Sequence, residues 1–89
     1  MNEGNACERT IGLDLGDRFT EGRVLNELGE VIEAFRIRTT ESAIAARLGS
    51  LAPSRVVLEV GTHSPWVSRC VAKHGHETIV ANPRRVRLI

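Results

Sequence analysis

Two short apolar segments, each with a single acid near its end, constrain the fold of this 89-residue chain more than any other feature. Residues Thr10–Leu15 have the sequence TIGLDL and are followed by Gly16, whereas residues Arg55–Val60 have the sequence RVVLEV and are followed by Gly61. A short apolar run that ends at a turn residue is typical of a strand buried on both faces. The two segments therefore predict two interior strands of one sheet.

Turn and helix signals predict the remaining elements. Gly29 can adopt the positive φ of a hairpin turn, Thr40 can cap a helix, and Ser64 can cap a second helix with proline at its first position. The predicted elements in chain order are strands at 10–15, 19–26 and 30–38, a helix at 40–52, a strand at 55–60, a helix at 64–74 and a strand at 77–81. This order, β-β-β-α-β-α-β, predicts an α/β fold with a mixed sheet and helices packed against it.

Composition is typical of one small packed domain. The chain is 42% hydrophobic and only 3% aromatic, which predicts an aliphatic core. We expect residues 1–9 to form a disordered lead-in and residues 10–89 to form one partial domain. Cys7 and Cys70 lack the spacing of a zinc site and are typical of reduced cysteines. No secretory signal or membrane-spanning segment is visible, so a cytoplasmic location is expected.

The charge pattern is informative only near the end of the chain. The formal net charge of +1 says nothing by itself about nucleic acid. Arg84, Arg85 and Arg87 nevertheless form a basic cluster with no acid after Glu77. Such a cluster is compatible with contacts to DNA phosphates and equally with a solvated surface, and both interpretations stay open.

Asp14 and Glu59 are the residues that most need an explanation. Each occupies the end of an otherwise apolar strand, where removing a lone carboxylate from water costs several kcal/mol. If the two strands are parallel neighbours, the two carboxylates lie side by side at the carboxyl ends of the strands, where α/β sheets bind ligands. A divalent cation would remove their repulsion, and oxygen ligands favour Mg²⁺ or Mn²⁺. The pattern predicts half of a two-metal phosphoryl-transfer site.

Structural roles compete with this interpretation. Asp14 can accept hydrogen bonds from the following turn, and Glu59 can pair with an arginine. Asp17 beside glycine favours a turn residue over a metal ligand. His63 favours a polar loop position, although at the mouth of the site it could meet a phosphate or orient water. Trp66 favours a core anchor over a platform for base stacking. The last two histidines, His74 and His76, suggest a helix end.

Three motifs resemble the N-terminal domain of the transposases of insertion sequence family 110. They are Ile11–Gly16 (IGLDLG) with the hairpin after it, Val57–Trp66 (VLEVGTHSPW) and Val80–Arg84 (VANPR). The resemblance covers nearly the whole chain from Ile11 onward, and the second motif is much more specific than the first. It implies a ribonuclease-H-like fold, similar to Holliday-junction resolvases, that carries an Asp-Glu-Asp-Asp quartet.

The resemblance also implies roles for particular residues. Asp14 and Glu59 match the first and second catalytic acids of the family, and both would bind metal. The other two family acids lie in a later Asp-x-x-Asp-Ala segment, and a serine thought to be the nucleophile lies in a C-terminal domain. We therefore expect a truncated transposase with little or no strand-transfer activity by itself. The implied partners are DNA and, by family resemblance, a guide RNA and other transposase subunits.

Two other classes of function remain open. Actin-like ATPases and sugar kinases also begin with a Gly-x-Asp-x-Gly strand and hairpin, but a small residue usually follows the second glycine, where this chain has Asp17-Arg18. The fourth strand's Glu59 is also better matched by nucleases. Alternatively, the chain is a non-catalytic partner that binds a full-length transposase through an unpaired sheet edge.

Overall fold

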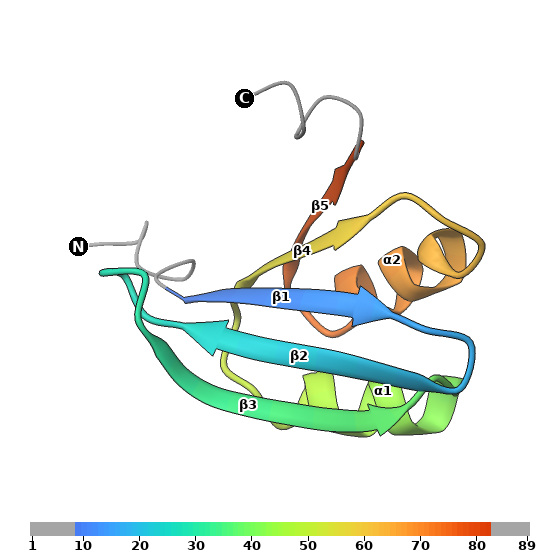
Figure 1. The fold of residues 1–89 in the computed structure, drawn as a ribbon, viewed down its shortest axis with the longest axis horizontal. Helices are drawn as coiled ribbons and strands as arrows, with labels where there is room; N and C mark the ends of the chain where they lie inside the picture. Colours follow the sequence, from blue (N-terminus) through green and yellow to red (C-terminus); the bar gives the residue numbers. More distant parts are fainter. Residues whose placement is uncertain (1–8, 83–89) are drawn as a thin grey trace.

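The computed structural model describes residues 9–82 and contains the seven elements in the predicted order (Figure 1). They are β1 (Thr10–Leu15), β2 (Phe19–Leu25), β3 (Val31–Arg38), α1 (Glu41–Gly49), β4 (Arg55–Glu59), α2 (Ser64–Lys73) and β5 (Glu77–Ala81). The predicted α/β class and mixed sheet are therefore confirmed. Within residues 9–82, no helix is long and apolar enough to cross a membrane.

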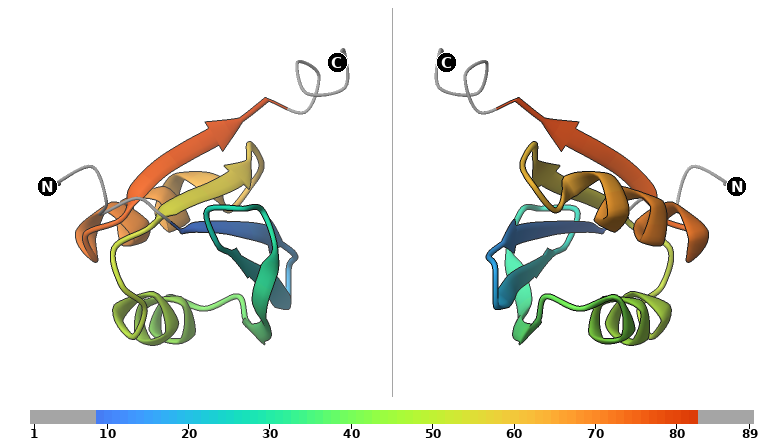
Figure 2. Two further views of the ribbon diagram at one scale, coloured as in Figure 1. Left: turned by 90° about the vertical axis from the view of Figure 1, so that its left-hand side faces the viewer. Right: turned by 90° about the vertical axis from the view of Figure 1, so that its right-hand side faces the viewer.

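One five-stranded sheet has the order β3-β2-β1-β4-β5. The central strand β1 pairs antiparallel with β2 and parallel with β4, and β4 pairs parallel with β5. Both crossovers, from β3 to β4 and from β4 to β5, move in the same direction across the sheet. Because such crossovers share one hand, they place both helices on the same face of the sheet (Figure 2).

The core lies between this face and the two helices, and it is aliphatic as predicted. Its buried side chains are Ile11, Leu13, Val24, Ile44, Leu48, Val56, Leu58, Val67, Cys70 and Val71. The prediction that β1 and β4 are buried on both faces is wrong, because only alternate residues of each strand are buried. The opposite face, which we call the open face, has no helix over it among the described residues.

The hairpin from β2 to β3 follows the predicted alternation. Phe35 and Ile37 pack against the core, while Glu33 forms an ion pair with Arg47 of α1. The ring of Phe35 lies over Gly22, where an added Cβ would come within 2.1 Å of the ring. A glycine is therefore needed at position 22 to admit the aromatic side chain.

The helix caps agree with the sequence in one case and differ in the other. The Thr40 hydroxyl accepts a hydrogen bond from the Ala43 N–H at 3.2 Å, which confirms the predicted cap of α1. The prediction that Ser64 caps α2 is wrong, because α2 already includes Ser64 and its hydroxyl donates to the Gly61 carbonyl at 2.9 Å. The helix α1 also ends at Gly49, before Pro53.

The two histidines near the end of α2 have different roles. His74 lies at the helix end, with its Nδ1 2.9 Å from the Cys70 carbonyl oxygen. His76 is buried instead, with Nδ1 accepting from the Ser54 N–H at 3.0 Å and Nε2 donating to the Leu48 carbonyl at 2.8 Å. Its neutral ring therefore joins the end of α1 to the start of β4, and the sequence prediction for His76 is wrong.

Candidate functional site

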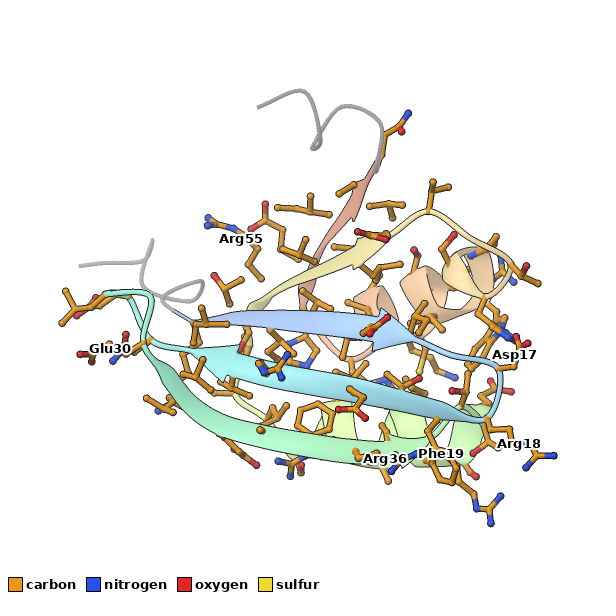
Figure 3. The ribbon with its side chains drawn as sticks, viewed as in Figure 1. Asp17, Arg18, Phe19, Glu30, Arg36 and Arg55 are labelled. Carbon is orange, nitrogen blue, oxygen red and sulfur yellow. The ribbon has the colours of Figure 1, made fainter. Side chains whose placement is uncertain are left out.

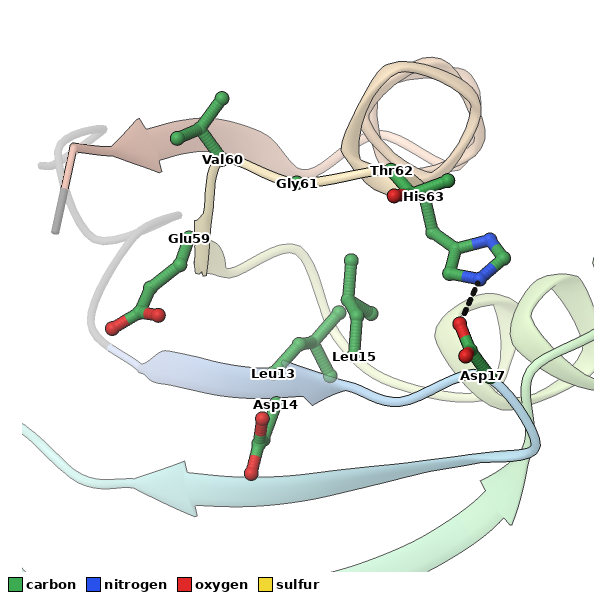
Figure 4. Close-up of a pocket in the computed structure, with 9 residues that line it drawn as sticks. All are labelled: Leu13, Asp14, Leu15, Asp17, Glu59, Val60, Gly61, Thr62 and His63. Carbon is green, nitrogen blue, oxygen red and sulfur yellow. Dashed lines mark hydrogen bonds and ion pairs between the residues drawn. The ribbon is translucent and has the colours of Figure 1, made fainter.

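A pocket opens where β1 and β4 end, between the turn after β1 and the loop after β4 (Figure 4). Its volume is about 480 Å³. The residues around it are Leu13, Asp14, Leu15, Asp17, Glu59, Val60, Gly61, Thr62 and His63. The chain adds β2 and β3 on one side of β1 and then β4 and β5 on the other side, so the strand order reverses at β1. Open α/β sheets bind ligands at the carboxyl ends of strands where this reversal occurs, and the pocket lies at such a position.

Asp14 and Glu59 occupy equivalent positions on neighbouring parallel strands. The register pairs Leu13 with Leu58, so the next residue on each strand is one of the two acids. Leu13 and Leu58 are both buried under the helices, and the following residues therefore point to the open face. Neighbouring strands are about 4.8 Å apart. The structure thus brings together two carboxylates that are 45 positions apart in the sequence, both on the border of one pocket.

The sequence predicted that Asp14 and Glu59 are removed from water, and this prediction is wrong. Asp14 and Glu59 are exposed, so neither pays the desolvation cost of a buried carboxylate. The competing structural roles do not occur within residues 9–82 either. There, neither carboxylate forms a hydrogen bond with the turn or an ion pair with an arginine. What distinguishes the two acids is their shared register rather than their burial.

A third acid, Glu21, continues the same row across the open face. It is the direct cross-strand partner of Asp14 on β2, and Arg36 of β3 follows it in register. Glu21, Asp14 and Glu59 also border a shallower groove along this face. Glu21 was not among the site residues predicted from the sequence. The sequence does contain a signal for this pairing, because only three residues separate β1 from β2. A hairpin this short pairs Leu15 with Thr20 and therefore Asp14 with Glu21.

This row of like charges is unfavourable for the fold. Like charges directly opposite each other on paired strands reduce stability, typically by about 0.2–1 kcal/mol for each pair. Of the three acids, only Glu21 has a cationic partner among the described residues, with the Arg36 Nε at 3.7 Å from its carboxylate. A hard cation near Asp14 would offset this repulsion.

The donor set fits such a cation only in part. Carboxylate oxygens are suitable ligands for Mg²⁺ or Mn²⁺. In the described part of the chain, however, no group of three or more His, Cys, Asp or Glu side chains is arranged to hold a metal ion. The acids Asp14 and Glu59 therefore form an open pair of ligands rather than an enclosed site.

Hydrogen bonds join Trp66, His63 and Asp17, and the last two of these side chains border the pocket. The Trp66 Nε1 donates to the His63 Nδ1 at 3.1 Å, so the opposite ring nitrogen, Nε2, carries the proton that faces Asp17 at 3.2 Å. Asp17 lies in the turn after β1 and His63 directly precedes α2 (Figure 4). This contact joins the two loops around the pocket. Trp66 packs against the core, as predicted, and also orients His63.

Cys70 is not part of this site. Its thiol is buried beneath α2, and burial raises the thiol pKa, with a further increase from nearby Glu41 and a partial offset from Lys73. A protonated, buried thiol is a poor nucleophile and a poor metal ligand. Cys70 is part of the buried core, whereas Cys7 lies outside the described residues.

The predicted basic cluster at Arg84, Arg85 and Arg87 lies outside the described residues. Comparison with known proteins does not assign a family: no protein-family model matches the chain, and no curated protein has significant sequence similarity to it.

Proposed function

We propose that Asp14 and Glu59 bind a divalent cation, Mg²⁺ or Mn²⁺, as part of a metal-dependent nuclease domain that acts on DNA phosphodiesters. One observation carries this proposal: the two acids occupy equivalent positions on adjacent parallel strands, each directly after one residue of the Leu13–Leu58 pair, near the ends of those strands and on the open face. Neither has a partner among residues 9–82 that would explain its presence structurally.

The fold supports a ribonuclease-H-like type within this proposal. Three antiparallel strands followed by two helix crossovers place the first strand at the centre of the sheet, with its acid beside the acid of the fourth strand. We infer that the chain corresponds to the N-terminal part of a transposase or recombinase domain, as the three sequence motifs suggest. DNA is then the substrate, with a guide RNA and other transposase subunits as further proposed partners.

The chain's own residues would have distinct tasks in this chemistry. Asp14 and Glu59 would supply negatively charged oxygen ligands, and the Asp17–His63 contact would hold the two surrounding loops in place. A bound cation would polarise the phosphodiester and stabilise the charge that develops on its oxygens. Because two acids form only an open pair of ligands, we expect weak metal binding and little or no strand transfer by this chain alone.

Thermal unfolding with and without Mn²⁺ tests the proposal. At ten times the dissociation constant, a ligand specific for the folded state adds about 1.4 kcal/mol, which raises the Tm of a domain this size by about 6–11 °C. We expect Asp14→Asn and Glu59→Gln to abolish the shift. Glu27→Gln, in the exposed hairpin turn, is the matched control and should retain it.

The opposite results are equally informative. An equal Mn²⁺ shift in the wild type and in both acid variants would show that the cation binds elsewhere. Binding of ATP with micromolar affinity would contradict the nuclease proposal and favour the actin-like or sugar-kinase alternative.

A further inference from the structure

Phe19, Arg36 and Arg38 form a cluster on the open face, at the same end of the sheet as the acids. Figure 3 shows two members of this cluster, Phe19 and Arg36, beside each other. The strand β2 begins at Phe19 and β3 ends at Arg38, and these two residues are direct cross-strand partners. The guanidinium carbon of Arg36 lies 4.2 Å from the centre of the Phe19 ring, and that of Arg38 lies 5.7 Å from it. We call this group the arginine cluster.

In the folded chain, the guanidinium groups of Arg36 and Arg38 remain available to bind an anionic ligand. Arg36 has one acidic neighbour, Glu21, at 3.7 Å, and both side chains are more than half exposed, so water weakens this pair. Within residues 9–82, Arg38 has no ion-pair partner. Stacking on Phe19 orients the planar groups without using their N–H donors. Two oriented cations therefore face outward together.

Arg47 and Arg55 differ from the arginine cluster, because each is paired with an acid and serves the packing or the pairing of the sheet. Arg47 is paired with Glu33 and stacks on Phe35 beside α1, so its charge contributes to the packing of the helix. Arg55, at the opposite end of the open face, is paired with Glu77 at 3.6 Å. In the arginine cluster, by contrast, Phe19 is 37% exposed and stabilises little of the core.

The arginine cluster lies close to the acids on the open face. Arg36 lies in the same cross-strand row as Glu21, Asp14 and Glu59. Two strand spacings, about 10 Å, separate β3 from β1. The positions of Arg36 and Arg38, two residues apart on one strand, are about 6.8 Å apart along it. A ligand with repeated phosphate groups can therefore contact both arginines and still reach Asp14.

We propose that Arg36 and Arg38, held on the ring of Phe19, bind the phosphate backbone of DNA and direct it across the open face toward Asp14. Arginine is suited to this because its planar group binds phosphate through two parallel hydrogen bonds. The choice of DNA rests on the proposed function. Binding to the arginine cluster requires no cation, so the two proposals can fail independently.

Fluorescence anisotropy with a labelled DNA duplex, measured in EDTA over a range of salt concentrations, tests this inference. We expect the Arg36→Gln/Arg38→Gln variant to bind roughly a hundred-fold more weakly at low salt, about ten-fold for each arginine. The slope of log affinity against log salt should decrease by about 0.9 for each lost phosphate contact. The matched control, Arg55→Gln, should bind like the wild type because it alters an exposed arginine at the other end of the same face.

Two further variants distinguish binding from folding. Glu21→Gln removes the acid beside Arg36 and should tighten DNA binding, a gain that unfolding cannot produce. Asp14→Asn should bind DNA in EDTA at least as well as the wild type, even where it abolishes the Mn²⁺ shift. A wild type that binds DNA in EDTA but shows no Mn²⁺ shift, or shows the same shift as Asp14→Asn, would therefore refute the proposed function alone.

Four results would overturn the inference. The first three are absence of DNA binding by the wild-type chain, equal losses in the double variant and Arg55→Gln, and a clear preference for RNA of the same sequence over the DNA duplex. A retained salt slope in a folded double variant would also contradict it, because the phosphate contacts would then lie elsewhere.

Discussion

Leu13 of β1 is buried beneath the two helices, whereas its neighbour Asp14 lies on the open face and is exposed. The same alternation divides the whole sheet. On the helix side, aliphatic side chains form one continuous core, while the open face carries a row of three acids and the arginine cluster. Residues that stabilise the fold and residues proposed to act on DNA therefore come from the same strands and are separated only by side-chain direction.

The two faces also differ in how their residues affect the stability of the fold. The side chains on the helix side stabilise the fold, so substitutions there should reduce stability. The acidic row on the open face reduces stability in the wild-type protein, because like charges lie opposite each other. No neighbouring residue in the described chain compensates for this unfavourable arrangement at Asp14. This is the reason why we propose a bound cation there.

The largest difference in the free energy of unfolding is expected between variants at two neighbouring positions of β4, Leu58 and Val57. Leu58→Ala removes a fully buried side chain and should lower the free energy of unfolding by about 2–5 kcal/mol. Val57→Ala, on the open face, should cost less than about 1 kcal/mol because the side chain is only half-buried. Urea unfolding measures both, and equal losses would mean that the open face is covered in solution.

The two histidines give the next largest contrast. His76→Ala leaves the Ser54 N–H and the Leu48 carbonyl without their partner in a buried position, which should cost about 2–4 kcal/mol. His74→Ala, at the half-buried end of α2, should cost less than about 1 kcal/mol. Similar thermal stabilities of the two variants would contradict the bridging role of His76.

A smaller effect of opposite sign is expected at the acidic row. In EDTA, Asp14→Asn should stabilise the protein by about 0.2–1 kcal/mol, because it removes the like charge opposite Glu21. Glu27→Gln provides the control, since Glu27 has no such neighbour in the sheet. Destabilisation by Asp14→Asn in urea unfolding would instead indicate a structural role for this carboxylate.

The smallest effect concerns pH and Cys70. Since burial raises the pKa of this thiol above its ordinary value of 9.0, the unfolded state loses its proton first as the pH rises. The stability contribution is therefore complete below about pH 9 and is lost as the pH rises through the pKa of the folded state. Comparing the wild type with Cys70→Ala between pH 8 and pH 10.5 isolates this contribution, which should be absent from the variant.

Much of this organisation could be predicted from local patterns. Thr40 identified the start of α1, and Gly29 identified a turn that uses a φ of 83°. Each prediction depends on residues within a few positions of each other. His76 could not be assigned in this way, because both of its partners, Ser54 and Leu48, lie more than 20 positions away.

The candidate site divides in the same manner. Asp14 and Glu59 stand out in the sequence as lone acids at the ends of apolar strands. Both residues and their positions in the strands could therefore be predicted from their neighbours in the sequence. Glu21 and the arginine cluster were not found, because their relation to Asp14 depends on the register of three strands. The energetic reason for singling out the acids was also wrong, because it assumed burial.

The amino-acid sequence by itself determined the order of elements, the aliphatic core and the placement of two acids at strand ends, since these follow from periodicity and turn chemistry. Only the tertiary structure decided which face of the sheet is covered. Two crossovers of one hand that advance in one direction place both helices on one side, and this leaves the acids and arginines on the other. No local pattern contains that information, because it arises from the path of the whole chain.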